Sequence, residues 1–164
     1  MSRCWKLGDN VATDEILPFQ YMTLTEPEEL GLHVLENVRP GFAAQLAPGD
    51  ILVAGSNFGY GSSREHAPLA LKGAKVGAVV AASYARIFFR NCINIGLPAV
   101  VCPAGAEEAE EGDCITLDMQ AGTLRNETKN RSYAFQPFPE SVIEYLADGG
   151  LINTLNKKRR EILL

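Results

Sequence analysis

The sequence has few histidines and cysteines, the residues that hold most zinc ions in proteins. It contains only two histidines, His33 and His66, and its four cysteines include no Cys-x-x-Cys pair. Zinc sites need four such ligands at short, recognisable spacings. We therefore expect the chain to hold no metal, and its cysteines to be reduced thiols of a cytoplasmic protein.

Long apolar runs and excess positive charge are also missing. No stretch approaches the roughly 18 uninterrupted apolar residues of a membrane-spanning helix, and the opening segment MSRCWKLGD lacks the apolar part of a secretory signal. We expect no contact with a membrane. Lys and Arg number 15 against 20 Asp and Glu, a net charge of −5. Because nucleic acids are bound by clustered cations, they are not an expected partner.

What remains is the composition of an ordinary globular protein. The chain has 164 residues, of which 46% are hydrophobic and 21% charged. That length is typical of one domain, which at this size buries roughly 70% of its unfolded surface. We therefore expect a single domain over residues 1–164, without internal repeats.

Three short apolar runs in the middle of the sequence are bounded by glycine-containing turns. The apolar residues in each run are continuous, which favours strands that are covered on both faces. The expected strands are 51–55, 76–82 and 99–102, and the expected helices between them are 64–72 and 84–95. Because strands and helices alternate, we predict an α/β fold with a central, mostly parallel sheet flanked by helices.

The segment before these runs is patterned differently. Residues 9–25 hold turn formers and show no sustained period, which predicts a long ordered loop after a short first strand. Long loops inside a compact domain often carry function. A helix is expected over about 26–38, with Thr25 as its N-cap, because apolar residues recur there at helical spacing.

The segment after Pro103 becomes acidic and then strand-like. Residues 114–118 and 132–135 favour an antiparallel excursion, and about 139–148 favours a last helix. The pair Gly149-Gly150 is expected to end that helix.

The window from Gly55 to Pro68, GSNFGYGSSREHAP, places three glycines between a buried strand and a helix. Ser62, Ser63 and Arg64 then stand at the expected helix start, where free backbone N–H groups and the helix dipole favour an anion. An Arg guanidinium can bind a carboxylate or phosphate through two hydrogen bonds. Ser62 and Glu65 also have the spacing of a capping box, which satisfies the same N–H groups without a ligand. These residues alone leave an anion site and a structural cap equally open.

Two nucleotide-binding motifs do not fit this window. A Walker loop needs a Lys directly after its last glycine, but Ser62 follows Gly61. A dinucleotide fingerprint needs a third glycine where Arg64 stands, and an acidic residue at the end of the next strand, which residues 76–83 lack.

Other polar residues are interpreted as structural. His66 is expected to be packed within the first turns of a capped helix, and His33 to be exposed on a charged helix. Arg86 and Arg90 are one helical turn apart, and a solvated face is the favoured interpretation.

Two segments carry a resemblance to a known family. They are GSNFGYGSSREHAPLALKGA, from Gly55, and SYARIFFRNCINIGLP, from Ser83. With the TDEILP segment from Thr13, they resemble the small subunits of 3-isopropylmalate dehydratase, which are similar to the swivelling C-terminal domain of aconitase. The resemblance implies a swivelling β/β/α domain with a central, mostly parallel sheet. Tyr60 departs from the family, which more often has a Cys at that position.

The resemblance implies a hydro-lyase reaction of leucine biosynthesis. In that reaction 2-isopropylmalate and 3-isopropylmalate are interconverted by loss and re-addition of water, which needs a positioned base and stabilisation of charge on a carboxylate. Family members use a four-iron, four-sulfur cluster as Lewis acid, held by cysteines at recognisable spacing. This chain has no such set. The resemblance therefore implies an iron–sulfur large subunit as the partner and a small hydroxy-dicarboxylate as the substrate.

Site roles carry over to the SSREHAP block. Ser62 would be the catalytic base, and Ser63 and Arg64 would bind a substrate carboxylate. Serine is a weak base unless its oxyanion is favoured, and a helix start together with Arg64 would provide such a field. We therefore expect the Ser62 hydroxyl to face the cleft, with backbone amides supporting it.

The resemblance also implies that substrate choice depends on the loop after Thr13. Relatives that act on a substrate with an extra carboxylate have an Arg just after the aromatic residue of this loop. Here the expected substrate-binding residues are Tyr21, Met22, Thr23 and Leu24. They include no cation, so burying a carboxylate against them would be costly.

Met22 and Leu24 suit a branched alkyl group, which favours 3-isopropylmalate. The related substrates 2,3-dimethylmalate, citramalate and homoaconitate stay open, since a methyl group or two discriminates by only about 1–3 kcal/mol.

A non-catalytic module that binds a small anion or a partner is the alternative from another class. The joint presence of Ser62, Ser63 and Arg64 favours the enzyme. Since either kind of chain would be inactive alone, the discriminating observation is dehydratase activity after an iron–sulfur large subunit is added.

Overall fold

The computed structural model describes residues 2–163, and parallel strands form its centre. These strands are β1 (Ser2–Lys6), β2 (Ile51–Ala54), β3 (Ala78–Ala81) and β4 (Ala99–Val101). They lie in the order β4-β3-β2-β1, and each neighbouring pair is parallel. Every residue of β2 and β3 is buried, as their continuous apolar sequences predict. The α/β class and the three predicted central strands are confirmed.

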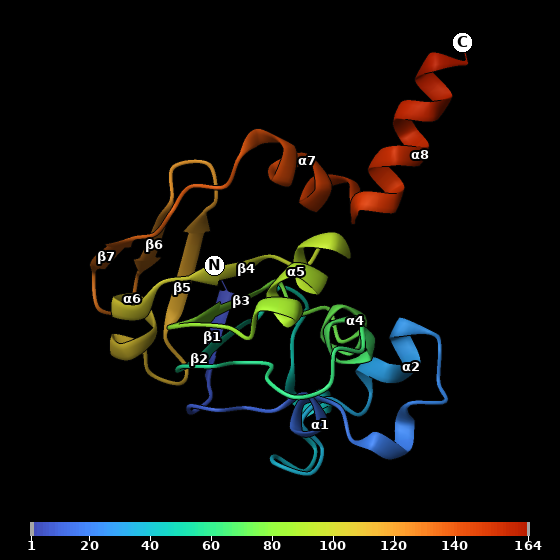
Figure 1. The fold of residues 1–164 in the computed structure, drawn as a ribbon. Coiled ribbons are helices and arrows are strands. Elements are labelled where there is room, and N and C mark those ends of the chain that lie inside the picture. Colours follow the sequence, from blue (N-terminus) through green and yellow to red (C-terminus); the bar gives the residue numbers. More distant parts are fainter. Residues whose placement is uncertain (1, 164) are drawn as a thin grey trace.

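Helices cover one face of these strands (Figure 1). The connection from β1 to β2 holds α1 (Thr13–Ile16), the 3₁₀-helix η1 (Phe19–Tyr21), α2 (Pro27–Gly31) and α3 (Phe42–Gln45). The next two connections hold α4 (His66–Gly73) and α5 (Arg86–Asn94). Trp5, Leu52 and Val79 point from the strands into a core shared with Phe42 and Phe88. This helix-covered side is the one that carries the glycine-rich loop.

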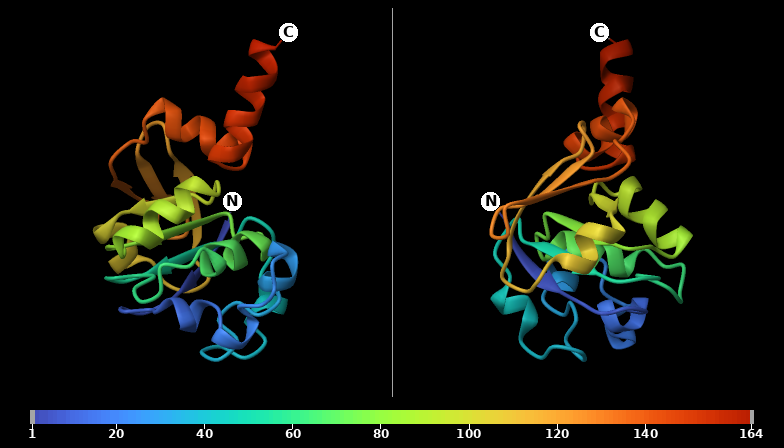
Figure 2. Two further views of the ribbon diagram at one scale, coloured as in Figure 1. Left: turned by 45° about the vertical axis from the view of Figure 1, so that its right-hand side comes forward. Right: turned by 90° about the vertical axis from the view of Figure 1, so that its left-hand side faces the viewer.

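Antiparallel strands and a short helix cover the opposite face (Figure 2). They are β5 (Cys114–Asp118), β6 (Thr123–Asn126), β7 (Arg131–Ala134) and α6 (Pro103–Glu108). β5 pairs antiparallel with β1 and extends the sheet to seven strands. Val53 and Val80 pack there with Ile115 and Leu124 in a second core. The β/β/α layering implied by the resemblance is confirmed.

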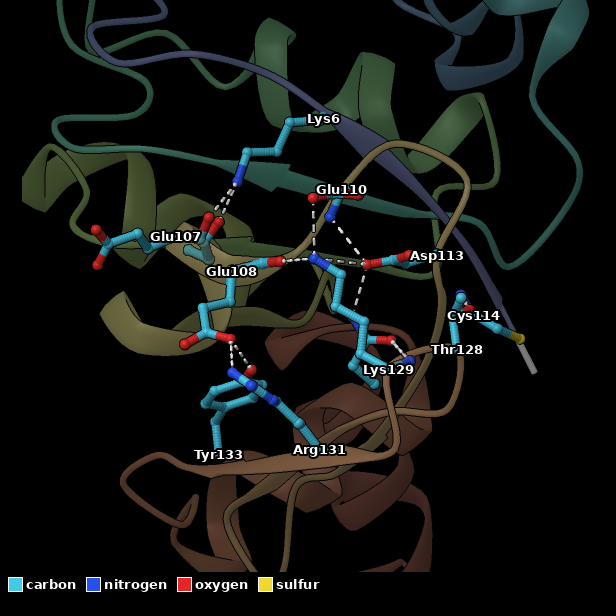
Figure 3. Close-up of polar contacts among 12 residues, drawn as sticks. Lys6, Glu107, Glu108, Glu110, Asp113, Cys114, Thr128, Lys129, Arg131 and Tyr133 are labelled. Carbon is cyan, nitrogen blue, oxygen red and sulfur yellow. Dashed lines mark hydrogen bonds and ion pairs between the residues drawn. The ribbon is translucent and has the colours of Figure 1, made fainter.

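A network of charged groups fastens α6 to this antiparallel ribbon (Figure 3). The Lys129 ammonium group donates to the Glu108 carbonyl at 2.5 Å and lies 3.2 Å from the Glu110 carboxylate. The buried Asp113 carboxylate accepts hydrogen bonds from the Glu110 amide at 2.9 Å and from Asn126 Nδ2 at 2.6 Å. Burial raises the pKa of Asp113, but the two hydrogen bonds and the Lys129 charge together hold it below its ordinary value.

The last two helices extend beyond the sheet (Figures 1 and 2). α7 (Glu140–Asp148) ends at Gly149, as predicted, and α8 (Leu151–Ile162) continues the chain away from it. Within α8 only Thr154 is buried. Among the described helices, none has the length and apolar character to cross a membrane.

Several predicted elements differ from the structure. The helix expected over 26–38 ends at Gly31, because Leu35 has a φ of 55° and donates its N–H to the Ile16 carbonyl at 2.8 Å, outside any helical pattern. Its N-cap is Glu26, one residue after the predicted Thr25. The expected loop over 9–25 contains α1 and η1. The sequence did not predict α3, α6 or β6.

Candidate functional site

The glycine-rich loop is fixed by backbone hydrogen bonds to its neighbours. The Phe58 N–H donates to the Ser83 carbonyl at 3.0 Å, and the Gly59 N–H donates to the Val11 carbonyl at 2.8 Å. Gly59 has a φ of 79°, and a Cβ there would lie 2.1 Å from Cγ of the Phe88 ring. Glycine is needed at this position both for the backbone conformation and for the close approach of Phe88.

The capping box that the spacing of Ser62 and Glu65 left open is not formed. α4 begins at His66, and its N-cap, Glu65, makes no side-chain hydrogen bond to the helix. Ser62 Oγ accepts only a long hydrogen bond, 3.4 Å, from the Arg64 N–H. The segment 62–64 therefore precedes the helix as exposed loop, and the Ser62 hydroxyl is not used as a cap.

His66 differs from its prediction as well. It is the first residue of α4, not one within its early turns. Its Nδ1 atom is buried and has no hydrogen-bond partner among the described residues.

α1 supports the glycine-rich loop from the other side. The Thr13 N–H donates to the Tyr60 carbonyl at 2.9 Å, and Thr13 Oγ1 accepts from the Ser62 N–H at 3.1 Å. Gly61 has a φ of 108° and leaves just enough room for this contact, since a Cβ there would lie 3.2 Å from Thr13 Oγ1. The backbone at Ser62 is thus held by α1, while its side chain is left for the cavity beside it.

A cavity of about 150 Å³ brings the two predicted site segments together. Ser62 and Arg64 come from the glycine-rich loop, and Met22 comes from the predicted substrate loop. The other residues that line it are Thr13, Asp14, Leu17, Phe19 and Ala67. The lining therefore combines four polar side chains with four apolar ones.

Arg64 is the cation of this cavity. Its guanidinium carbon lies 5.4 Å from the centre of the Phe19 ring, which is 71% exposed. Within residues 2–163 it forms no ion pair with a carboxylate, so its hydrogen-bonding groups are available to a bound anion. Asp14 places one negative charge in the same lining.

The remaining predicted site residues lie beside the cavity lining. The Ser63 carbonyl accepts a hydrogen bond from Asn91 Nδ2 of α5 at 3.2 Å. Leu24 is partly buried against the helix-side core, and Thr23 is exposed. Tyr21 stacks on His33, with their ring centres 3.6 Å apart. His33, expected to be exposed, is half-buried by this contact.

Five residues of the lining were not predicted as site residues: Thr13, Asp14, Leu17, Phe19 and Ala67. The first three lie in the TDEILP segment, which carries part of the resemblance. Arg86 and Arg90, predicted to form a solvated face, line a larger groove of about 590 Å³ between α5 and the start of α7.

The chain's own residues do not fit an iron–sulfur cluster. Among residues 2–163, no three side chains of the types Cys, His, Asp and Glu gather as a metal site. Burial, followed by the nearby Asp113 carboxylate, raises the pKa of Cys4 to about 12. Burial also raises the pKa of Cys92 and Cys102. Cys92 lies in the helix-side core and Cys4 and Cys102 lie in the second core, whereas a cluster needs its cysteine ligands gathered at one site.

The fold and this cavity define a domain of the aconitase C-terminal class, and the family model described as the aconitase C-terminal domain matches residues 10–104. The 3-isopropylmalate dehydratase small subunit of Hydrogenobaculum sp. is 51% identical over 92% of each chain. The chain belongs to the 3-isopropylmalate dehydratase small-subunit family.

Two further relatives show the range of this family. A crystal structure of 3-isopropylmalate dehydratase from Methanocaldococcus jannaschii superposes with a TM-score of 0.90 at 40% identity, over 99% of this chain and 95% of that one. The methanogen homoaconitase small subunit of Methanothermobacter thermautotrophicus is 49% identical over 92% of this chain and 87% of its own length. Because relatives with different substrate names are almost equally similar, overall identity does not select the substrate.

Proposed function

We propose that the chain is the small subunit of a hydro-lyase that interconverts 2-isopropylmalate and 3-isopropylmalate. The observation that carries this proposal is the joint lining of one cavity by Ser62, Arg64 and Met22. A malate-type substrate needs a base, a cation for a carboxylate and an apolar surface for its alkyl group. The cavity offers one residue for each of these requirements.

Ser62 is the proposed base, which removes the proton next to a substrate carboxylate. Charge then develops on that carboxylate, and the Arg64 guanidinium stabilises it through charge-assisted hydrogen bonds. Because α4 begins only at His66, the helix dipole acts on Ser62 from a greater distance than the sequence predicted. The positive field at Ser62 therefore comes mainly from Arg64. Ser63 completes the proposed carboxylate site.

The substrate loop provides the apolar side of the cavity. Met22, Leu17 and Phe19 line it, and the loop from Tyr21 to Leu24 contains no cation. A second carboxylate buried there would lose hydration without gaining a partner, whereas an isopropyl group is favoured. This supports 3-isopropylmalate over homoaconitate, although a relative named homoaconitase small subunit is 49% identical. Citramalate and 2,3-dimethylmalate differ from it by a few methyl groups and are the alternative substrates.

Loss of the hydroxyl group needs a Lewis acid that this chain does not supply. We place a four-iron, four-sulfur cluster on a separate large subunit, and the names of the relatives, which describe small subunits, support such a partner. We further propose that residues 1–164 act as one swivel domain in a cytoplasmic complex. The pairing of β1 with both β2 and β5, and the four free cysteines, support these two points.

Reconstitution tests this function. The purified chain is mixed with a purified iron–sulfur large subunit, and conversion of 3-isopropylmalate, citramalate and homoaconitate is followed. We expect no activity from the chain alone, and activity of the mixture that is highest on 3-isopropylmalate. A clear preference for homoaconitate would contradict the substrate argument. Tight association without turnover on any malate would favour the non-catalytic interaction module.

A further inference from the structure

Three polar side chains form a cluster at the substrate loop: Tyr21 from the loop itself, and His33 and Glu36 from the segment after α2. The Tyr21 and His33 rings are stacked, 3.6 Å apart and inclined by 11°. The Tyr21 hydroxyl donates to Glu36 Oε1 at 3.1 Å, and His33 Nδ1 lies 2.7 Å from Glu36 Oε2. Hydrogen bonds from His33 and then from Tyr21 hold the pKa of Glu36 below its ordinary value. Both oxygens of the carboxylate are thus engaged by the two stacked rings.

This cluster is the polar attachment of the loop to the rest of the protein. The N–H groups of Tyr21, Met22 and Leu24 donate only to carbonyls within residues 18–25, at 3.1 Å each. Across residues 2–163, the Tyr21–Glu36 bond is the one hydrogen bond that joins 18–25 to any residue outside that segment. Apolar contacts of Tyr21, Met22 and Leu24 with the core supply the rest of the attachment. Such contacts are less directional than a hydrogen bond.

Glu36, in turn, stands on a turn that is tied to α1. Leu35 is fully buried, has a φ of 55° and donates its N–H to the Ile16 carbonyl at 2.8 Å. The Arg39 N–H closes the turn on the Leu35 carbonyl at 2.7 Å. A bulky residue keeps a positive φ only when its surroundings fix it. α1 also contributes Thr13 and Asp14 to the cavity lining. The cluster therefore joins the substrate loop to α1, and both of these segments line the cavity.

We propose that Glu36 and His33 are positioning residues for substrate choice. They fix the side chain of Tyr21. Because Met22 is the next residue, its position in the cavity lining is fixed as well. There it meets the alkyl group of the substrate. This inference rests on the proposed function and deepens it. It makes Tyr21 a residue that acts through the position of Met22, and it gives His33 and Glu36 a part in specificity although neither lines the cavity.

The kinetic test uses the complex with the large subunit. Tyr21→Phe removes the hydroxyl and keeps the stack, and Glu36→Ala removes both acceptors. Each is expected to raise the KM for 3-isopropylmalate on the order of 10-fold, since a misplacement of 1 Å can cost up to about 100-fold. kcat should stay within about two-fold, because Ser62 and Arg64 are untouched. The preference for 3-isopropylmalate over citramalate should fall in parallel.

Three comparison variants separate this role from a merely structural one. Glu36→Gln keeps an oxygen that accepts from Tyr21 and should restore most of the wild-type KM. The double variant of Tyr21→Phe with Glu36→Ala should be no worse than the poorer single one, because both changes remove the same bond. Glu29→Ala removes an exposed carboxylate of α2 that has no ion-pair partner among the described residues, and should behave as wild type.

Hydrogen exchange on the full chain provides a readout that does not depend on turnover. Tyr21→Phe and Glu36→Ala should speed exchange of the Tyr21, Met22 and Leu24 amides at least several-fold, with Glu29→Ala unchanged. Unchanged exchange at these amides would overturn the proposal, as would an active complex with wild-type KM and preference. Equal losses on every substrate together with a lower Tm would also overturn it. A wild-type complex that is inactive on every malate, with exchange still faster in the two variants, would refute the proposed function instead.

Discussion

Two segments that line the cavity are held in different ways. The segment with Ser62 and Arg64 forms a rigid wall, and the segment with Met22 forms an adjustable wall. The wall that carries Ser62 and Arg64 continues the glycine-rich loop, whose residues Phe58, Gly59 and Tyr60 are fixed by backbone hydrogen bonds to other segments. The Ser62 N–H is then held by Thr13 Oγ1. Within residues 2–163, the wall that carries Met22 has no backbone hydrogen bond to another segment and is held by side-chain contacts. A backbone ladder constrains position whatever the side chains are, whereas side-chain attachments change with each substitution.

We propose that the two walls have different roles in the reaction. Ser62, the proposed base, lies on the rigid wall, and Met22, which we propose meets the alkyl substituent, lies on the adjustable one. A small change in the second wall can alter substrate preference without disturbing the first.

The largest expected effect is on the rigid wall. Ser62→Ala should lower turnover of the reconstituted complex about 1000-fold, because a positioned base contributes roughly 10²- to 10⁴-fold. The variant should still fold and bind the large subunit, since the Ser62 N–H, not its hydroxyl, contacts Thr13. Steady-state kinetics and sedimentation measure the two properties. The matched control is Ser132→Ala, an exposed serine on β7 that should keep full activity.

The rigid wall can also be disrupted by a substitution at Gly59, where the backbone packs closely against the Phe88 ring. Gly59→Ala should lower the free energy of unfolding by about 3 kcal/mol, because the new Cβ meets the Phe88 ring in addition to an unfavourable φ. Gly49→Ala is the matched control, since Gly49 has a φ of 91° with nothing within 4 Å of a Cβ. It should lose only about 1 kcal/mol. Equal losses in urea unfolding would show that contact with Phe88 is not what fixes the loop.

A third region, the antiparallel ribbon, is expected to respond to pH rather than to backbone strain. Asp113→Asn should cost about 2 kcal/mol at pH 7, since Asp113 is buried and accepts two hydrogen bonds. Its pKa in the folded protein is lowered, so this stability is present above its unfolded pKa and is lost as pH falls through the folded value. The stabilities of wild type and variant should converge as the pH falls below about 4. A constant difference from pH 7 to pH 3 would be inconsistent with this account.

The smallest expected effect tests the adjustable wall. Met22→Ala should raise the KM for 3-isopropylmalate about 10-fold while changing that for citramalate little. Met22 lines the cavity, and on the proposed function its side chain meets only the larger alkyl group. Met119→Ala is the matched control, a methionine that is packed against the second core, away from the cavity. Equal changes on both substrates would remove Met22 from substrate choice.

The continuous apolar runs were enough to predict β2, β3 and β4 from the sequence, because a strand buried on both faces has no polar alternation to obscure it. The helix predicted over 26–38 is present over Pro27–Gly31 but was predicted too long, because the spacing of its apolar residues gives no sign of the positive φ at Leu35. That conformation is imposed by a tertiary hydrogen bond to Ile16.

The candidate site was predictable only in part. The order of residues in SSREHAP indicated Ser62 and Arg64, but not that α4 begins four residues after Ser62. The local spacing of Ser62 and Glu65 indicated a capping box, but a long-range contact with Thr13 holds the Ser62 backbone instead. The attachment of Tyr21 to His33 and Glu36 joins residues 12 and 15 positions apart, so no short motif reveals it.

The most direct test of the central claim, that Ser62 is the base, is exchange of the substrate proton with solvent. The complex is incubated with 3-isopropylmalate in deuterium oxide. Deuterium at the carbon that carries the isopropyl group, from which the proton is removed, is measured over time. We predict rapid incorporation by the wild-type complex and incorporation about 1000-fold slower by Ser62→Ala, with substrate still bound. Incorporation by Ser62→Ala at a rate near that of wild type would contradict the account.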